Sequence, residues 1–305
     1  MIVVMGIFAA DLIFHTPKLP AWTETVIGSG FGIGPGGKGS NQAIATARLG
    51  GTVEFLAKIG QDNFGAMARG IYANEGVGTR FLHESTDLPT GAAAIIIDDK
   101  AAENAIIVVP GAAAALTTDE IDAAADVIGS AAVFLTQLET PLPLVVHALR
   151  LARAKGVKTI LNPAPAAALS ADLLSLVDIL TPNETEAAML SGLPVTNTAE
   201  AEAAADALIA RGAGAVIITL GEKGALLRQK GETILVPAVR AGALVDTTGA
   251  GDSFNAAIAV ALSEGLPMAE ALHFACAVAG LKVTRAGAGA GMPMRAEVDA
   301  LLAAG

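Results

Sequence analysis

The chain contains one cysteine, Cys276, among its 305 residues. A single thiol excludes a disulfide framework, and it also excludes a zinc site built from several thiolates. Histidine is scarce as well, and the four present never stand at the spacing of metal ligands: His15, His83, His147 and His273. We therefore expect no structural metal.

Basic residues are also in short supply. The chain has 19 Lys and Arg against 30 Asp and Glu, a formal net charge of −11, and no basic run or aromatic–basic patch. Nucleic acid and acidic membrane surfaces are therefore poor candidates as partners. A small phosphorylated ligand stays compatible with this charge, because the backbone N–H groups at a helix N-terminus attract anions locally.

Long apolar runs are missing, although hydrophobic residues make up 53% of the chain and the mean hydropathy is +0.57. The longest stretch without a charged residue runs from Asn104 to Thr118 and is broken by Pro110. This is shorter than the roughly 18 residues that a membrane-spanning helix needs. The first residues, MIVVMGIFAAD, lack a basic start and predict a buried strand rather than a signal peptide. We expect a cytoplasmic protein.

The second half of the chain alternates between short β-branched runs and longer Ala/Leu-rich segments, which is typical of an α/β fold around a parallel sheet. The expected strands are Ile2–Met5, Val53–Ala57, Ala132–Leu135, Val157–Leu161, Val177–Leu180 and Ala215–Leu220. The expected helices are Leu142–Lys155, Glu184–Ser191, Ala199–Arg211, Gly251–Glu264 and Met268–Thr284. The length suits one large α/β domain over residues 1–305.

The first third of the chain predicts a second, smaller sheet. Its expected strands are Thr25–Ile33, Gly91–Asp98 and Asn104–Val109, with a hairpin turn at Asp98-Asp99-Lys100. We interpret this sheet as a flap contributed by insertions at residues 11–33 and 91–109, rather than as an independent domain.

A glycine-rich segment, DTTGAGDSFN from Asp246 to Asn255, precedes an apolar helix. The N–H groups of Ala250, Gly251 and Asp252 can therefore converge on an anion at the helix N-terminus. Asp252 in the first turn could accept a proton from a substrate hydroxyl as a general base. It could instead serve only as a helix-capping acid, and the residue types alone leave both interpretations open.

A second glycine-rich segment, GPGGKGSNQA from Gly34 to Ala43, opens another helix. It fails as a phosphate-binding P-loop because Gly39 stands where Ser or Thr must hold magnesium. It fails as a dinucleotide fingerprint because Glu54 comes too early to bind a ribose. What remains is a loop that can approach a small ligand, with Lys38 and Asn41 as polar donors.

Together, GGKGSNQA and DTTGAGDSFNAA resemble the two signature motifs of the PfkB family of carbohydrate kinases. Four further blocks agree in the family's order: Gln137–Glu139, Leu161–Ala166, Thr181–Glu186 and Ile218–Gly221. The resemblance implies the ribokinase-like fold, a three-layer α/β/α sandwich with a mostly parallel central sheet and a small β-sheet lid. It also implies an ATP-dependent kinase that phosphorylates the terminal hydroxyl of a pentose such as ribose, giving ribose 5-phosphate.

The resemblance carries roles for particular residues. Asp252 would deprotonate the sugar hydroxyl, while the amides around Gly249, Ala250 and Gly251 stabilise the transferring phosphoryl group. The implied sugar-binding residues are Asp11, Gly37, Lys38, Asn41, Glu139 and Asp252. The implied nucleotide-binding residues are Asn183, Thr219, Gly221, Gly224, Gly251 and Cys276, although Cys276 can also be a small buried helix residue.

Two cations and a second subunit are also implied. Asn183 and Glu186 would hold Mg²⁺ through water, the alternative being that Glu186 is an exposed helix acid. A monovalent cation, potassium, would be held by a set comprising Asp246, Thr248, Lys282, Arg285, Gly287 and Gly291. The lid would close over the sugar and pair with the lid of a second copy, forming a homodimer.

One position departs from the family pattern. Ala9 stands where ribose kinases of the family usually have Asn, two residues before Asp11. The missing amide favours a deoxy or substituted sugar, so deoxyribose, a hexose and a nucleoside remain alternative substrates. A sugar-binding regulator without catalysis is the alternative from another class, and the presence of Asp252, Asn183 and Glu186 argues against it. An NAD oxidoreductase is disfavoured by the failed dinucleotide motif.

Overall fold

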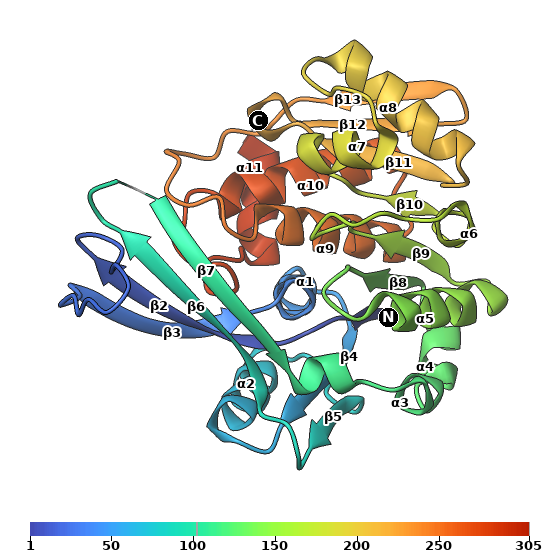
Figure 1. Ribbon diagram of the computed structural model, residues 1–305. Helices are drawn as coiled ribbons and strands as arrows, with labels where there is room; N and C mark the ends of the chain where they lie inside the picture. The colour runs from blue at the N-terminus through green and yellow to red at the C-terminus, as the bar shows by residue number, and fades with distance from the viewer. Residues whose placement is uncertain (102, 305) are drawn as a thin grey trace.

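The computed structural model describes residues 1–101 and 103–304 and is built on a nine-stranded sheet (Figure 1). The strand order is β13-β12-β11-β10-β9-β8-β1-β4-β5. The bounds are β1 Ile2–Met5, β4 Val53–Gly60, β5 Leu82–Ser85, β8 Val133–Thr136, β9 Lys158–Leu161, β10 Ile179–Leu180, β11 Ala215–Thr219, β12 Ala225–Gln229 and β13 Glu232–Val236. The pairs from β5 to β11 are parallel, and only β12 and β13 join by antiparallel pairing.

Helices cover both faces of this sheet. One face carries α1 Lys38–Arg48, α2 Asn63–Glu75, α9 Ala250–Ser263, α10 Met268–Lys282 and α11 Arg295–Ala304. The other carries α3 Thr118–Asp122, α4 Ala125–Ser130, α5 Leu142–Ala154, α6 Ala171–Leu174, α7 Glu184–Ser191 and α8 Thr198–Ala210. Within β1, Ile2 and Val4 enter the first core while Val3 and Met5 enter the second. This alternation gives the three α/β/α layers that the sequence predicts.

The predicted second sheet is also present, and it projects from the body on the left of Figure 1. Its four strands are β3 Gly30–Gly36, β2 Ala9–Thr16, β6 Thr90–Asp98 and β7 Glu103–Gly111, in that order. The predicted hairpin is confirmed, since β6 and β7 pair antiparallel out to Asp98 and Glu103.

Two details of the predicted second sheet are wrong. The strand expected over Thr25–Ile33 begins only at Gly30 and runs to Gly36; residues 25–28 form no regular structure, and the Ser29 N–H donates to His15 O at 2.9 Å. The strand β2, which carries Asp11 on the small sheet, was not predicted. Residues 2–10 form one almost entirely apolar run in the sequence. The hydrophobic pattern therefore does not show where β1 of the large sheet ends and β2 of the small sheet begins.

Short 3-10 turns complete the chain at η1 Ala112–Ala115 and η2 Gly221–Lys223. Within the described ranges, no helix is both long and apolar enough to cross a bilayer.

Candidate active site

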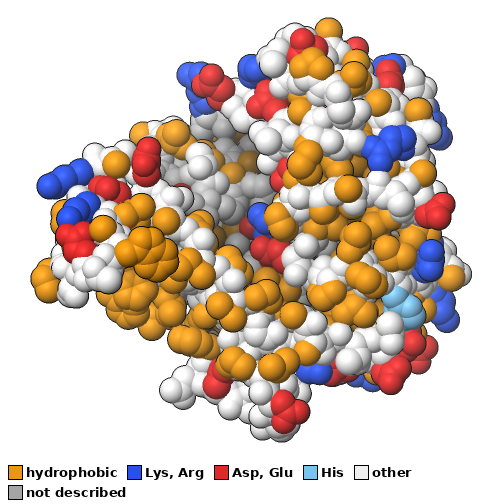
Figure 2. Space-filling view, in the orientation of Figure 1, with side chains coloured by type: hydrophobic (Ala, Val, Ile, Leu, Met, Phe, Trp, Pro, Cys, Tyr) orange, Lys and Arg blue, Asp and Glu red, His pale blue; other side chains and the backbone are white. Residues whose placement is uncertain are grey.

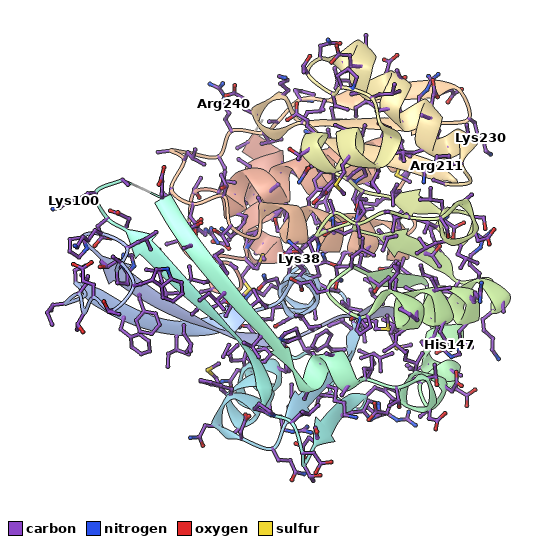
Figure 3. All side chains as sticks on the ribbon, in the orientation of Figure 1. Lys38, Lys100, His147, Arg211, Lys230 and Arg240 are labelled. Atoms are coloured by element: carbon purple, nitrogen blue, oxygen red, sulfur yellow. The ribbon has the colours of Figure 1, made fainter. Side chains whose placement is uncertain are left out.

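The candidate site lies at the carboxyl ends of the parallel strands, where α/β proteins usually bind ligands. Two adjoining cavities of about 210 and 500 Å³ meet there and share Thr219, Thr247 and Gly251. The smaller cavity is lined by Lys38, Asn162, Ala164, Thr181, Asn183, Glu186, Thr219, Thr247, Gly249, Gly251, Asp252 and Asn255. The surface is hollowed between the small sheet and the body (Figure 2), and Lys38 lies near the middle of the molecule at the start of α1 (Figure 3).

Asp252 is held rigidly at the start of α9. Gly249 caps this helix with a φ of +79°, a conformation that favours glycine, and Asp252 follows in the first turn with only 6% of its surface exposed. Its Oδ2 accepts a hydrogen bond from Asn41 Nδ2 at 3.1 Å, and its Oδ1 accepts one from Gln42 Nε2 at 3.1 Å. Burial raises the pKa of Asp252, while the Lys38 charge and these two amides lower it. The fixed orientation is what a general base needs.

The amide of Gln42 belongs to a polar network that the sequence analysis did not single out as part of the site. Gln42 Nε2 also donates to Asn162 Oδ1 at 3.2 Å, and Gln42 Oε1 accepts from Gln137 Nε2 at 2.5 Å. All three side chains are buried. Buried amides bonded to one another restrict each other's rotation, so the network positions Gln42 and through it Asp252. Gln137 and Asn162 are the first residues after β8 and β9, and this location at the strand ends was the available signal.

The N-terminus of α9 offers fewer free amides than expected. The Ala250 N–H donates to Thr247 O at 3.1 Å, so it is already occupied within the loop. The expected convergence of Ala250, Gly251 and Asp252 on one anion is therefore wrong for Ala250. The Gly251 and Asp252 amides stand at the end of a 14-residue helix, where its dipole also favours an anion.

The glycines at the start of α1 serve mainly to bring segments of the chain together. Gly37 has a φ of +89°, and a Cβ there would lie 2.5 Å from Ile7 O. A Cβ on Gly39 would lie 2.6 Å from the Gly6 Cα, so α1 packs directly on the chain leaving β1. These glycines are required by close backbone packing, and the expectation that the loop also approaches a ligand stays a prediction. The side chains of Lys38 and Asn41 are presented to the site as a result.

Glu139 follows β8 and is bound to the start of α1. Its Oε2 accepts a hydrogen bond from the Lys38 amide at 2.7 Å. The pKa of Glu139 is raised to about 7, mainly by burial; the Lys38 amide and charge oppose this rise, and the charges of Asp252 and Asp11 add to it. The carboxyl group therefore titrates near neutral pH.

Asp11 lies in β2 beside Gly36 of β3. A Cβ on Gly36 would come within 2.0 Å of Asp11 Oδ1, so the carboxylate occupies the space that this glycine leaves open. Burial raises the pKa of Asp11 to about 6. Ala9 precedes it on the same face of the strand and is 3% exposed. The predicted sugar residues Asp11, Gly37, Lys38, Asn41 and Glu139 are therefore brought together, while their roles stay predictions.

Asn183 and Glu186 form a capping box at the start of α7. Asn183 Oδ1 accepts from the Glu186 N–H at 2.8 Å, and Glu186 Oε2 accepts from the Asn183 N–H at 2.9 Å. Both residues also line the smaller cavity, and burial raises the pKa of Glu186. Glu186 is thus both a capping residue and a carboxylate facing the site. Among residues 1–101 and 103–304, no group of three or more His, Cys, Asp or Glu is arranged to hold a metal ion.

The larger cavity has an apolar lining that suits a flat aromatic ring. It includes the predicted Thr219, Gly221, Gly224 and Cys276. Most of the other lining residues were not predicted from the sequence, among them Ala238, Val239, Arg240, Gly242, Leu244, Phe254 and Gly280. Several of these follow β13, a strand that was not predicted. Burial raises the pKa of the Cys276 thiol to about 11, so this side chain is a small apolar wall residue.

The predicted potassium ligands gather where α10 ends. Asp246 accepts hydrogen bonds from the Thr248 N–H at 2.9 Å and from the Gly287 N–H at 2.8 Å. The ammonium group of Lys282, however, donates to the carbonyl oxygens of Asp246 and Arg285, each at 3.2 Å. These residues do not fit a free potassium ion, because a cation of the chain itself already lies at these carbonyls.

Comparison with known proteins agrees with this geometry. A family model described as pfkB family carbohydrate kinase matches residues 1–295. The chain is 40% identical over 294 residues to a ribokinase of Haemophilus influenzae, covering 96% of this chain and 95% of that protein. It is 38% identical over 307 residues to a ribokinase of Bacillus subtilis, covering 99% of each. The solved structure of an Arabidopsis thaliana ribokinase complexed with ribose and ATP has a TM-score of 0.94 and 33% identity, covering 99% of this chain and 98% of that one.

Proposed function

The chain belongs to the pfkB family of carbohydrate kinases, and from that premise we propose that it transfers the γ-phosphate of ATP to the terminal hydroxyl of ribose. The product is ribose 5-phosphate. The similar proteins that are named ribokinase, and the similar structure that holds ribose and ATP, support this choice of substrates. Because the reaction consumes ATP, we propose that the enzyme works in the cytoplasm.

One observation carries the proposal. The Asp252 carboxylate is fixed by Asn41 and Gln42 at the point where a small polar cavity opens into a larger apolar one. A sugar hydroxyl beside Asp252 and a nucleotide base in the larger cavity would leave the phosphates between them, at the N-terminus of α9. This is the arrangement that direct phosphoryl transfer requires.

The chain's own residues divide the chemistry. Asp252 takes the proton from the attacking hydroxyl, so the oxygen gains charge as it approaches phosphorus. The amides of Gly251 and Asp252, with the α9 dipole, bind the charge that spreads over the phosphoryl oxygens. The Lys38 ammonium faces the same cavity and adds a positive charge beside three carboxyl groups.

Asn183 and Glu186 fit a magnesium ion held largely through water. Mg²⁺ is usually bound by one or two carboxylates together with substrate phosphates, and Glu186 faces the cavity where the phosphates would lie. When bound, the ion offsets the negative charge of those phosphates. Glu186 keeps its capping bond through Oε2, which holds the carboxylate in place.

The sugar would be bound by Asp11, Lys38, Asn41 and Glu139. The buried Asn41 Oδ1 has no hydrogen-bond partner among the described residues, which leaves it able to accept from a sugar hydroxyl. The small sheet, with β2 carrying Asp11, would close over the sugar as a lid of the single domain 1–305. Closure removes water that would otherwise compete as phosphoryl acceptor.

The outer face of this lid supports a homodimer. Phe14, Phe31, Ile33, Ile107 and Val109 share one face through the strand pairing and are 42 to 63% exposed. The Phe14 and Phe31 rings lie 5.0 Å apart between centroids, and hydrophobic side chains gather over this sheet in Figure 2. A contiguous apolar face of this kind usually marks a contact with another protein. A second copy of this chain, offering the same face by two-fold symmetry, would cover it.

The direct test is a coupled assay of ADP release with purified protein, ATP and Mg²⁺. The expected result is turnover with ribose that exceeds turnover with 2-deoxyribose, hexoses and nucleosides. Preference for another sugar would move the proposal to that substrate within the same family. Binding of ribose without ADP release from any sugar would instead indicate the sugar-binding regulator.

A further inference from the structure

Lys282 is the most deeply buried charged side chain that the site leaves without a role. It is the last residue of α10, and none of its surface is exposed. Its ammonium donates to the carbonyl oxygens of Asp246 and Arg285 at 3.2 Å each. Burial lowers the pKa of Lys282, and the Arg285 charge lowers it too, while the Asp246 carboxylate raises it.

The surroundings are built to receive this side chain. A Cβ on Gly291 would lie 2.6 Å from Gly287 O, 3.0 Å from Ala286 O and 3.1 Å from Lys282 Cε, so the glycine makes room for this loop and for the lysine together. The C-terminal end of α10 carries a partial negative charge that favours a cation. The amides of Val245 and Asp246 both donate to the Val283 carbonyl, which ties the segment before Gly249 to the end of the same helix.

This cluster leads directly to the phosphate site. Asp246 holds the Thr248 amide, and Thr248 precedes the Gly249 cap of α9. Asp246 also holds the Gly287 amide, so one carboxylate joins the two loops on either side of the Lys282 ammonium. A positive charge at this point stabilises the turn that aims the Gly251 and Asp252 amides.

We propose that the Lys282 ammonium is a built-in replacement for a bound monovalent cation, so that this enzyme needs no potassium for activity. Lys282 touches neither substrate nor phosphate and acts as a positioning residue, through Asp246 and Thr248. The ammonium makes the carbonyl contacts that a dissociable ion would otherwise make, and the space beside Gly291 admits the lysine side chain. The rate measurements that test this proposal rest on the proposed kinase activity, whereas the unfolding measurements do not.

The experiment compares the parent protein with Lys282→Ala and Lys282→Met, each in potassium-free buffer and with added KCl. The parent should change its kcat/KM by less than about twofold on adding KCl. Without potassium, the kcat/KM of Lys282→Ala should be about tenfold or more below that of the parent. Adding KCl should raise the kcat/KM of this variant at least about fivefold. Lys282→Met fills more of the space and should be restored less. Lys158→Met, which removes an exposed lysine of β9, should behave as the parent does.

Thermal unfolding gives a second measurement that does not depend on which sugar is phosphorylated. KCl should raise the Tm of Lys282→Ala and leave the parent Tm unchanged, because only a vacant site gains stability by binding the ion. If no sugar is phosphorylated, the proposed function fails, and this measurement still decides the role of Lys282.

Three results would overturn the inference. The first is a parent enzyme that KCl stimulates about fivefold or more, or stabilises by a clear rise in Tm. The second is a Lys282→Ala variant as active as the parent without potassium. The third is a folded, impaired variant whose rate and Tm ignore KCl, which would make Lys282 an ordinary packing residue. If both variants fail to fold, the response of the parent to KCl decides.

Discussion

Asn41 Nδ2 lies 3.1 Å from Asp252 Oδ2, and this hydrogen bond joins the first turn of α1 to the first turn of α9. The two residues belong to segments more than two hundred positions apart, each opened by glycines. The same Asn41 keeps its buried Oδ1 without a partner in the described part of the chain. One amide can therefore orient the base and also accept from a neighbouring hydroxyl of the sugar.

Asp252→Asn should reduce kcat by about a hundredfold or more, because a positioned general base contributes at least that much. The KM for the sugar should change little, since asparagine keeps the size of the side chain. Steady-state rates with ribose measure both constants, and the Tm checks the fold.

The control is Asp172→Asn, which changes an exposed acid in the first turn of α6 and should leave the rate unchanged. A kcat for Asp252→Asn within about threefold of the parent would show that this carboxylate is not the base.

Glu186→Gln should raise the Mg²⁺ concentration needed for half-maximal rate severalfold, because the charge facing the phosphates is lost. The glutamine can still accept from the Asn183 N–H, so α7 keeps its cap. The matched control is Glu184→Gln in the same turn, whose partner is Lys223 at 3.5 Å. If the Mg²⁺ curves of Glu186→Gln and the parent coincide, Glu186 serves only as a cap.

The central sheet could be predicted from the sequence because its strands are buried on both faces. Runs such as Ile2–Met5 and Ala215–Ile218 stand out as continuous apolar segments. Several of the missed segments lack this contrast: β12 and β13, for example, form an edge hairpin, and α2 contains glycines and an early Asn. Their positions are fixed by pairing and packing with distant residues, which local patterns do not record.

The site could be predicted in part for a similar reason. Asp252 and Asn41 stand next to glycines that mark a turn into a helix, so their segments were found from the sequence. Gln42 and Phe254 lie in the same segments, but which of their side chains reach the site depends on how α1, β8 and α9 meet, and a local pattern does not record this. The direction of the Lys282 side chain was equally hidden, because a lysine at a helix end is normally solvated.

The sugar affinity should fall as the pH is lowered through neutrality. The pKa of Glu139 is raised to about 7 and that of Asp11 to about 6, so both carboxyls gain protons as the pH falls through these values. A protonated carboxyl accepts fewer hydrogen bonds from sugar hydroxyls. The KM for ribose, measured from above pH 7 to below pH 6, should therefore rise on acidification.

The same raised pKa has a consequence for stability. Folded Glu139 holds its proton more tightly than the unfolded residue, so its contribution favours folding at low pH and is lost as the pH rises through about 7. Glu139→Gln cannot ionise, and its Tm relative to the parent should increase through this window. Glu84→Gln is the control, because the pKa of Glu84 is lowered, first by Arg69, and its Tm difference should stay level from about pH 4.5 to about pH 7, where that of Glu139→Gln changes. A Tm difference for Glu139→Gln that does not vary with pH would contradict the raised pKa.

A charge on the outer face of the lid should separate the dimer. Phe31→Glu places a carboxylate at a residue that is 60% exposed beside Phe14, and burying that charge in an apolar contact is unfavourable. Light scattering after size-exclusion chromatography should then give the mass of one chain instead of two. Leu235→Glu on the edge strand β13, where Leu235 is 50% exposed, should leave the dimer intact. A parent protein that is monomeric at all concentrations would remove the second copy from the proposal.

Ala9 offers a test of substrate choice inside the sugar site. It pairs with Gly36 and Gly91 on the two sides of β2, and the Asp11 carboxylate fills the space that Gly36 leaves open. An asparagine there would lie on the same face as Asp11, with its amide able to reach a sugar hydroxyl. We expect Ala9→Asn to raise kcat/KM for ribose by roughly tenfold, the effect of one net hydrogen bond of about 1.4 kcal/mol.

The comparison of ribose with 2-deoxyribose makes this last prediction specific, because only a gain confined to ribose assigns the new bond to the hydroxyl that 2-deoxyribose lacks. Ala9→Leu is the matched control, since it adds similar volume without an amide and should gain nothing for either sugar. A water bound beside the Ala9 methyl could already serve that hydroxyl at little cost, because an enclosed polar site holds water well. In that case the parent prefers ribose strongly and Ala9→Asn brings no gain, which would refute an unpaired hydroxyl while leaving ribose as the substrate.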